Sequence, residues 1–237
     1  MGEWTLEAVL FDAGNTLIHM PRQPEEILRE LCAQLGSPVG LEEARGACRE
    51  SERYYTRHYL DYSGDQGEFW LRYHAEALHH LGIEDPTGEK AAYLSHGFGR
   101  VGVWQAYPEA AGVCRRLQAG GFRLGVVSNG SVTVVDLLSQ AGLLSFFEVV
   151  IASQALGIQK PDPRVFAAAL EKLGAAPERA LYVGDLYEVD VLGARGAGLH
   201  AVLIDRRGGS RDRDCPVIGS LEELIPLVEG GGIPCQS

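Results

Sequence analysis

The sequence lacks the features that tie a chain to a membrane, a disulfide framework or a zinc site. No apolar run approaches the roughly 20 residues that a helix needs to cross a bilayer. The N-terminal stretch MGEWTLEAVLF has no basic region followed by a long apolar segment, so we expect no secretory signal. The five cysteines are odd in number, and none stands in a CxxC pair. These absences predict a cytoplasmic protein that does not associate with membranes.

Basic residues are also scarce. The chain has 21 Lys and Arg against 32 Asp and Glu, which gives a net charge of −11. Such a surface repels phosphate backbones, so the composition argues against a nucleic-acid partner. The densest basic stretch, DRRGGSRDRD at residues 205–214, mixes four arginines with aspartates. We therefore expect it to be a solvated loop.

Strand-like and helix-like segments alternate along most of the chain. Residues 6–11, LEAVLF, form a short apolar run that predicts a buried strand. Further strand-like runs alternate with helical stretches later in the chain, at residues 122–128, 147–153, 179–185 and 199–205. This alternation predicts a Rossmann-like α/β core, a parallel sheet with helices on both faces. The first strand is expected to join that sheet, because alone it has no partners.

A helical segment separates the first strand from the others. Its apolar residues recur at spacings of three to four, with Gly or Pro between the helices. We therefore predict a core made of residues 1–18 and 107–237, with an inserted all-helical domain at 19–106. The aromatic residues of the insertion are expected mainly in its core, with one or two left for a substrate pocket or a homodimer face. The principal ones are Tyr54, Tyr55, Trp70 and Tyr73.

Polar side chains follow the predicted strands directly, where open parallel sheets bind their ligands. Asp12 comes after VLF, Ser128 and Asn129 after GVV, and Asp185 after LYVG. Lys160 lies in the loop after VVIAS. Because the carboxyl ends of parallel strands meet at one edge of the sheet, we expect these residues to form one site.

The charges of these residues suit an anion and a divalent cation. We expect SNGS to open a helix, so that its N–H groups and the Ser128 hydroxyl bind an anion, with Lys160 adding positive charge. Asp12 and Asp185 would repel each other unless a divalent cation lay between them, and carboxylate oxygens are ligands that Mg²⁺ prefers. Asp12 could then attack the central atom of the anion, which is covalent catalysis followed by hydrolysis.

These residues stand in four segments that resemble the motifs of the haloacid dehalogenase-like superfamily of hydrolases. In chain order the segments are VLFDAGNTL, VVSNG, QKPDPRVF and VGDLYEVDVLGARGAG, and the resemblance spans residues 9–198. It implies that the helical insertion is the family's cap domain. It also implies an Mg²⁺-dependent phosphatase that acts on a small phosphorylated metabolite, with Asp12 as the nucleophile.

The resemblance further implies a role for each matched residue. The implied substrate ligands are Thr16, Ser128, Asn129 and Lys160. The implied metal ligands are Asp12, Asp185 and the backbone carbonyl of Gly14. Asp190, in the GDxxxxD spacing, would lie on the first turn of a helix and orient Lys160 or the waters of the metal.

The first motif departs from the family pattern at Gly14. Most phosphatases of the family have an Asp there, which protonates the leaving alcohol and later activates water. A positioned general acid contributes roughly 10²–10⁴-fold to a rate. Acyl phosphates escape this loss, because a carboxylate with a pKa of about 4 leaves without a proton. His19 and His58 are candidates for a substitute acid.

Two alternative functions follow from the same departure. The dehalogenase branch of the family also lacks the second Asp, and its nucleophile displaces halide from carbon without a metal. That branch typically loses the Gly-Asp of the fourth motif, whereas this chain keeps it in VGD, which favours the phosphatase. The other alternative is a catalytically weak phosphate-binding or regulatory protein that lost turnover together with the acid.

Overall fold

The computed structural model describes residues 6–58, 66–101, 104–130, 133–206, 208–209 and 213–229. The chain divides into two compact units. The core unit comprises Met1–His19 and Gln105–Ser237, and the helical unit comprises Met20–Trp104. Each unit buries apolar side chains of its own.

The core unit is built on a parallel sheet. Its described residues form a six-stranded sheet in the order β5-β4-β1-β6-β7-β8, and every pair of neighbours is parallel. The strands are β1 (Ala8–Phe11), β4 (Arg123–Ser128), β5 (Val149–Ala152), β6 (Ala180–Gly184), β7 (His200–Ile204) and β8 (Val217–Ile218). The predicted Rossmann-like α/β core is therefore confirmed. The sequence pattern missed β8, because a two-residue strand has no readable periodicity.

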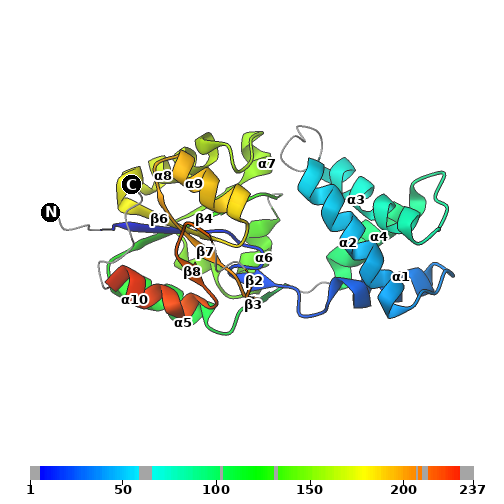
Figure 1. The fold of residues 1–237 in the computed structure, drawn as a ribbon. Coiled ribbons are helices and arrows are strands. Elements are labelled where there is room, and N and C mark those ends of the chain that lie inside the picture. The colour runs from blue at the N-terminus through cyan, green and yellow to red at the C-terminus, as the bar shows by residue number, and fades with distance from the viewer. Residues whose placement is uncertain are drawn as a thin grey trace. The chain divides into compact units, whose positions relative to one another are not determined.

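Helices cover both faces of this sheet, which explains why its strands are almost wholly apolar (Figure 1). In β1, Ala8 and Leu10 pack with α8 and α9, while Val9 and Phe11 are buried on the opposite face. The helices of the core unit are α5 (Ala110–Ala119), α6 (Val134–Gln140), α7 (Ser153–Leu156), α8 (Pro163–Leu173), α9 (Leu192–Gly196) and α10 (Leu224–Glu229). In Figure 1, α8 and α9 lie on one side of the sheet, and α5 and α10 lie on the other.

Helix α8 shows how local sequence places the loop before it. Asp162 caps the helix by accepting a 2.9 Å hydrogen bond from the Arg164 N–H, and Pro163 occupies the first turn, where a missing N–H costs nothing. Gly174 ends the helix with a left-handed φ of 61°. The buried face of α8 packs on β4 and β5, and it comprises Val165, Phe166, Ala169, Leu170 and Leu173. The loop that carries Lys160 is thereby fixed against the sheet.

The chain leaves and re-enters the core unit through two short strands. Strands β2 (Ile18–His19) and β3 (Gln105–Ala106) pair antiparallel, Ile18 with Ala106 and His19 with Gln105. The Tyr107 N–H adds a 3.0 Å hydrogen bond to the Leu17 carbonyl. The chain thus leaves the core unit within a few residues of Asp12.

The described part of the helical unit is all-helical, as predicted. Its helices are α1 (Pro24–Gln34), α2 (Leu41–His58), α3 (Gln66–His80) and α4 (Glu89–Val101). Their packed faces form a separate apolar core that includes Ile27, Leu28, Leu31, Ala47, Leu78 and Leu94. These residues recur at the three-to-four spacing that indicated helices in the sequence.

The aromatic residues of the helical unit differ in how deeply they are buried. Phe69 is fully buried, whereas Trp70 is 36% exposed and Tyr54, Tyr55 and Tyr73 are half-buried. The rings of Tyr54 and Trp70 lie 5.6 and 5.5 Å from the Phe69 ring. The expectation of core positions was wrong for Trp70 and was met only in part by the three half-buried tyrosines, of which Tyr73 donates from its hydroxyl to Glu52.

Three expectations from composition can be compared with the described residues. None of their helices has the length and apolar character required to cross a membrane. The four cysteines within the described ranges carry free thiols, and Cys235 lies outside those ranges. In the 205–214 stretch, residues 207 and 210–212 also lie outside them. The solvated-loop expectation was wrong for Arg206, whose side chain is only 16% exposed because it packs against Tyr107 and the first motif.

Candidate active site

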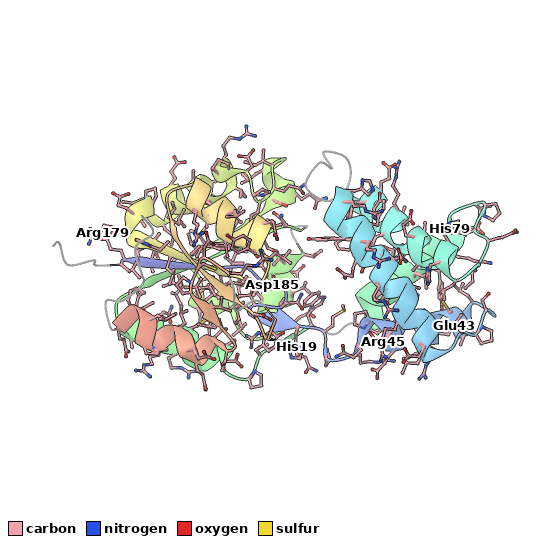
Figure 2. All side chains as sticks on the ribbon, in the orientation of Figure 1. His19, Glu43, Arg45, His79, Arg179 and Asp185 are labelled. Carbon is pink, nitrogen blue, oxygen red and sulfur yellow. The ribbon has the colours of Figure 1, made fainter. Side chains whose placement is uncertain are left out.

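The sheet order places three strand ends side by side at its carboxyl edge. From β1, the chain builds the sheet outward through β4 and β5, and then through β6, β7 and β8 on the other side. Asp12 follows β1, Ser128 ends β4 and Asp185 follows β6, so the predicted residues cluster where the strand order reverses. Asp185, labelled in Figure 2, lies just beyond the last residue of β6.

A buried lysine lies at the centre of this cluster. The Lys160 ammonium donates to Asp12 Oδ1 and to Asp190 Oδ1, each at 2.7 Å, and to the Tyr182 hydroxyl at 2.9 Å. The Lys160 side chain is 2% exposed, and that of Asp190 is 1% exposed. All three N–H groups of the ammonium therefore have acceptors.

The backbone of Lys160 is fixed by Asn129. The Lys160 N–H donates to Asn129 Oδ1 at 2.7 Å, and Asn129 Nδ2 donates to the Lys160 carbonyl at 2.9 Å. This reciprocal pair joins the ends of the second and third motifs. The observed contact of the Asn129 side chain is thus with Lys160, and the substrate role of its N–H stays a prediction.

Tyr182 is a site residue that the sequence analysis missed. Its hydroxyl accepts from Lys160 and donates to the Val127 carbonyl at 2.9 Å, while its ring packs edge-on against Phe166 at 5.0 Å. The signal available in the sequence was a hydroxyl-bearing residue in the middle of the apolar strand ALYVG.

The electrostatics of the cluster are dominated by burial and by the ion pairs. Burial opposes the charged form of Lys160, but Asp12 and Asp190 outweigh it and raise the pKa of Lys160 well above its usual range. Burial raises the pKa of Asp12 to about 6, against the attraction of Lys160 that lowers it. Lys160 is therefore a permanent cation at neutral pH.

Asp190 links the fourth motif to the lysine. Its Oδ2 accepts from the Leu186 N–H at 2.9 Å, while its Oδ1 accepts from Lys160. A Cβ at Gly184 would lie 2.4 Å from the Asp190 carboxyl carbon, so only glycine fits there. Asp190 was expected on the first turn of a helix, and it lies in the first turn of a short π-helix, Tyr187–Val191, that precedes α9. This wider turn brings its carboxylate back toward the strand end.

Asp185 is the more exposed acid of the site. It is half-buried, and burial followed by the charges of Asp12 and Asp190 raises its pKa well above the usual range. The Asn15 side chain donates a hydrogen bond to Asp185 and partly offsets these effects. Asn15 has a left-handed φ of 55°, which Asn tolerates better than most residues. The sequence analysis missed this residue.

Two hydroxyl groups complete the predicted anion pocket. Thr16 Oγ1 is buried and has no hydrogen-bond partner within the described protein, which marks a place for a ligand oxygen. Ser128 is 8% exposed at the end of β4. The SNGS segment was expected to open a helix; its Ser131 lies outside the described residues, within which α6 starts at Val134. The Gly130 N–H instead donates to Ser153 Oγ at 3.2 Å, and β-branched residues follow at 132–135, which disfavour an earlier helix start.

The two histidines named as substitute acids have aromatic neighbours. His19 stacks on Tyr107 with ring centroids 4.4 Å apart, and Figure 2 labels it beside β2. His58 lies 4.6 Å from the Tyr54 ring within the helical unit. Neither contact involves Asp12, so a catalytic role for either histidine stays a prediction.

The donor set fits a divalent cation. Asp12 and Asp190 pair with the ammonium of Lys160, and Asp185 adds a third carboxylate to the cluster, so two negative charges are left unbalanced when all three are ionised. The donors are oxygens, which suits Mg²⁺. Among the described residues, no three His, Cys, Asp or Glu side chains are placed to hold a metal by themselves. A site of two carboxylates and the Gly14 carbonyl, with waters completing the shell, remains compatible with the residues present.

The raised pKa of Asp12 predicts how stability depends on pH. The folded chain holds this proton more tightly than the unfolded chain, so the stability that Asp12 contributes is full below about pH 4 and is lost as pH rises through about 6. Asp12→Asn has no such loss. In EDTA, we expect the melting temperature of Asp12→Asn minus that of the wild type to increase between about pH 4 and pH 7. A difference that stays constant or decreases over this range would contradict the raised pKa of Asp12.

A comparison with known families agrees with this geometry. A family model described as haloacid dehalogenase-like hydrolase matches residues 6–198. The chain belongs to the haloacid dehalogenase-like hydrolases. The resemblance predicted from the four motifs is thus confirmed, and so is the assignment of the protein as a hydrolase.

Several curated members of the haloacid dehalogenase-like hydrolases are similar over most of their length. A glyceraldehyde 3-phosphate phosphatase of Methanopyrus kandleri is 31% identical, and the match covers 88% of this chain and 88% of the relative. A phosphoserine phosphatase of Thermus thermophilus is 32% identical over 93% of this chain and 98% of the relative. Both relatives are phosphatases, in keeping with the preference that Asp185 indicated.

Solved structures of haloacid dehalogenase-like hydrolases share the fold. A hydrolase from Bacillus subtilis, solved with bound magnesium, matches with a TM-score of 0.81 and 23% identity, over 95% of this chain and 99% of the other. The L-2-haloacid dehalogenase of Xanthobacter autotrophicus matches with a TM-score of 0.70 and 23% identity, over the same shares of the two chains. Because a magnesium-bound hydrolase and a dehalogenase both have this fold, the fold alone does not select the reaction.

Proposed function

We propose that this hydrolase is an Mg²⁺-dependent phosphatase that acts on a small phosphorylated metabolite through an aspartyl-phosphate on Asp12. The observation that carries the proposal is the placement of one buried lysine among three carboxylates at the carboxyl edge of the sheet. A dehalogenase displaces halide without a metal and has no need of this excess of negative charge. The phosphatase relatives support the same choice.

Substrate binding would use two hydroxyl groups and one positive charge of the site. The Thr16 hydroxyl, which is buried and has no hydrogen bond to the described part of the chain, is suited to donate to a phosphoryl oxygen. Ser128 at the end of β4 offers a second hydroxyl, and Lys160 supplies the positive charge. Asn129 would act by holding Lys160 in place, in addition to the N–H that it can direct to the phosphoryl group.

The chemical step would begin at Asp12. Lys160 fixes the carboxylate through its bond to Oδ1, so that the group is oriented for attack. A bond forms between an Asp12 oxygen and phosphorus, and the bond to the leaving oxygen breaks. Water then attacks phosphorus, which breaks the bond to Asp12 and releases phosphate.

Asp12, Asp185 and the Gly14 carbonyl would hold Mg²⁺, with Asp190 supporting Lys160. The ion would neutralise negative charge on the phosphoryl oxygens and on the carboxylates, which otherwise repel the substrate. Asp190 contributes through the lysine, because its carboxylate already accepts from Lys160 and from the Leu186 N–H.

The helical unit would serve as a cap that excludes bulk water during turnover. This part of the proposal is supported by the insertion of the helical unit, Met20–Trp104, directly after the first motif. Selectivity for one phosphorylated metabolite would then depend on side chains of the helical unit.

The experiment that tests the proposal is phosphate release from p-nitrophenyl phosphate with added Mg²⁺. We expect turnover with Mg²⁺ and none after EDTA. Chloride release from a 2-haloacid that EDTA does not affect would overturn the proposal in favour of a dehalogenase. Binding of phosphate esters in a thermal-shift assay, without hydrolysis, would overturn it in favour of a binding protein.

The absence of an acid at Gly14 predicts a preference among leaving groups. We expect kcat/KM for acetyl phosphate to exceed that for glycerol phosphate by about 10²–10⁴-fold, because an alkoxide needs a proton that this motif does not supply. Gly14→Asp is the matched variant, and Gly14 does not have the left-handed φ that would strain an Asp. The variant should raise turnover of glycerol phosphate and leave that of acetyl phosphate within about threefold. Equal turnover of both substrates by the wild type would refute this preference.

A further inference from the structure

Arg206 makes an unusual set of contacts beneath the first motif. It follows β7, and its guanidinium donates from Nε to the Asn15 carbonyl at 3.1 Å and from Nη2 to the Thr16 carbonyl at 2.8 Å. Its Nη1 forms a 2.7 Å ion pair with Glu109. The guanidinium carbon lies 3.3 Å from the centroid of the Tyr107 ring.

The two carbonyls belong to the tight loop after the nucleophile. The Asn15 N–H donates to the Ile18 carbonyl at 2.7 Å, and the N–H groups of Leu17 and Ile18 both donate to the Ala13 carbonyl at 3.0 Å. These bonds are internal to the loop. Arg206 ties two further carbonyls of this loop, those of Asn15 and Thr16, to a part of the chain that lies 190 residues after Thr16.

The side chains of the same two residues serve the site. Asn15 donates to Asp185, and Thr16 presents a buried hydroxyl that has no hydrogen-bond partner among the described residues. A planar guanidinium can hold two adjacent carbonyls at once, which a lysine ammonium does less well. Fixing both carbonyls fixes the backbone from which the Asn15 amide and the Thr16 hydroxyl project.

Arg206 also touches the point where the chain returns from the helical unit. Tyr107, which stacks on the guanidinium, stacks as well on His19 at 4.4 Å and bonds through its N–H to Leu17. The ion pair with Arg206 lowers the pKa of Glu109 despite its partial burial, so this partner stays charged at neutral pH. One guanidinium therefore joins the first motif, the segment after β3 and the end of β7.

We propose that Arg206 is a positioning residue for the proposed phosphoryl transfer: it holds the Asn15 and Thr16 carbonyls and thereby aligns the Thr16 hydroxyl with the phosphoryl group. The kinetic part of this inference rests on the proposed function. The structural part is a clamp, meaning the two hydrogen bonds by which Arg206 fixes the backbone of residues 13–18, and it is independent of the proposed function. None of the four motifs contains Arg206, and the sequence analysis assigned it to a solvated loop.

The test compares Arg206→Ala and Arg206→Lys with the wild type, and with Arg123→Ala as a control. Arg123 also pairs with a glutamate, Glu148 at 2.7 Å, but at the start of β4 and away from the first motif. Hydrogen exchange of the peptide covering residues 12–19 is measured by mass spectrometry. Turnover of p-nitrophenyl phosphate is measured below the melting temperature of each variant and referred to the folded fraction.

We expect Arg206→Ala to speed exchange in residues 12–19 and to lower kcat by about 10- to 100-fold with KM within about threefold, because small misplacements of reacting groups cost about this much. Arg206→Lys can keep the pair with Glu109, so it should recover the melting temperature but not kcat. Arg123→Ala should change neither the exchange nor kcat.

Several results would overturn the inference. If hydrogen exchange at residues 12–19 is unchanged in both Arg206 variants, Arg206 does not hold the backbone of residues 13–18. If Arg206→Ala has the wild-type kcat per folded molecule, or if Arg206→Lys fully restores kcat, Arg206 contributes only to stability. If Arg206→Ala does not fold, the hydrogen exchange and kcat of Arg206→Lys are compared with those of the wild type instead. If the wild type releases no phosphate, the proposed function fails, and the exchange measurement alone decides whether the clamp exists.

Discussion

Replacing Asp12 with Asn removes phosphate release: we expect kcat to fall by about 10⁴-fold or more, the scale seen when a covalent nucleophile is deleted. The amide is a poor nucleophile, so no acyl phosphate can form at this position. The substitution keeps an oxygen that can accept the bond from Lys160, now at 2.7 Å from Asp12 Oδ1. The loss should therefore be chemical and not a loss of fold.

The control for this prediction is Asp136→Asn, an exposed acid on α6 that also belongs to the core unit. It should retain the wild-type kcat. Circular dichroism and thermal melts of Asp12→Asn should show a folded protein. Residual activity of Asp12→Asn above about 1% of the wild type would place the nucleophile elsewhere.

Replacing Lys160 with Met is the most destabilising single change we expect. Methionine matches the length of the lysine but leaves the buried carboxylates of Asp12 and Asp190 without their shared cation. Removing one member of a buried charge pair typically costs about 3–5 kcal/mol. We expect a loss of this size in the free energy of unfolding, measured by urea denaturation at neutral pH in EDTA.

A double variant separates charge from packing. Asp190→Asn added to Lys160→Met removes one stranded carboxylate, so part of the lost stability should return. Lys172→Met on the exposed face of α8 is the matched control and should change stability by less than about 0.5 kcal/mol. A loss in Lys160→Met no larger than that of the control would contradict the buried network.

Much of the site was predictable because it follows strand ends. Asp12, Ser128 and Asp185 each end an apolar run, and parallel strands bring such positions to one edge. Gly184 and Asp190 belong to the GDxxxxD pattern of the fourth motif. The structure explains the glycine, because a Cβ at position 184 would overlap the Asp190 carboxylate.

The rest of the site depends on contacts that no local pattern encodes. Tyr182 looks like one more residue of a buried strand until Lys160 is placed beside it. Arg206 lies in a loop whose charges nearly cancel, and its burial is set by Tyr107 and Glu109, about 100 residues away. The start of α6 at Val134 was missed because the glycine after Asn129 bonds across to Ser153 before any helix begins.

The measurement that tests the central claim most directly is chemical trapping of the intermediate. The enzyme is mixed with acetyl phosphate and Mg²⁺, quenched in acid within one turnover, and reduced with borohydride, which converts an aspartyl-phosphate to homoserine. Mass spectrometry of the peptide around residue 12 then locates the label. We predict homoserine at position 12, dependent on substrate and absent from Asp12→Asn. Phosphate release with no label at Asp12, or with the label at another aspartate, would contradict the account.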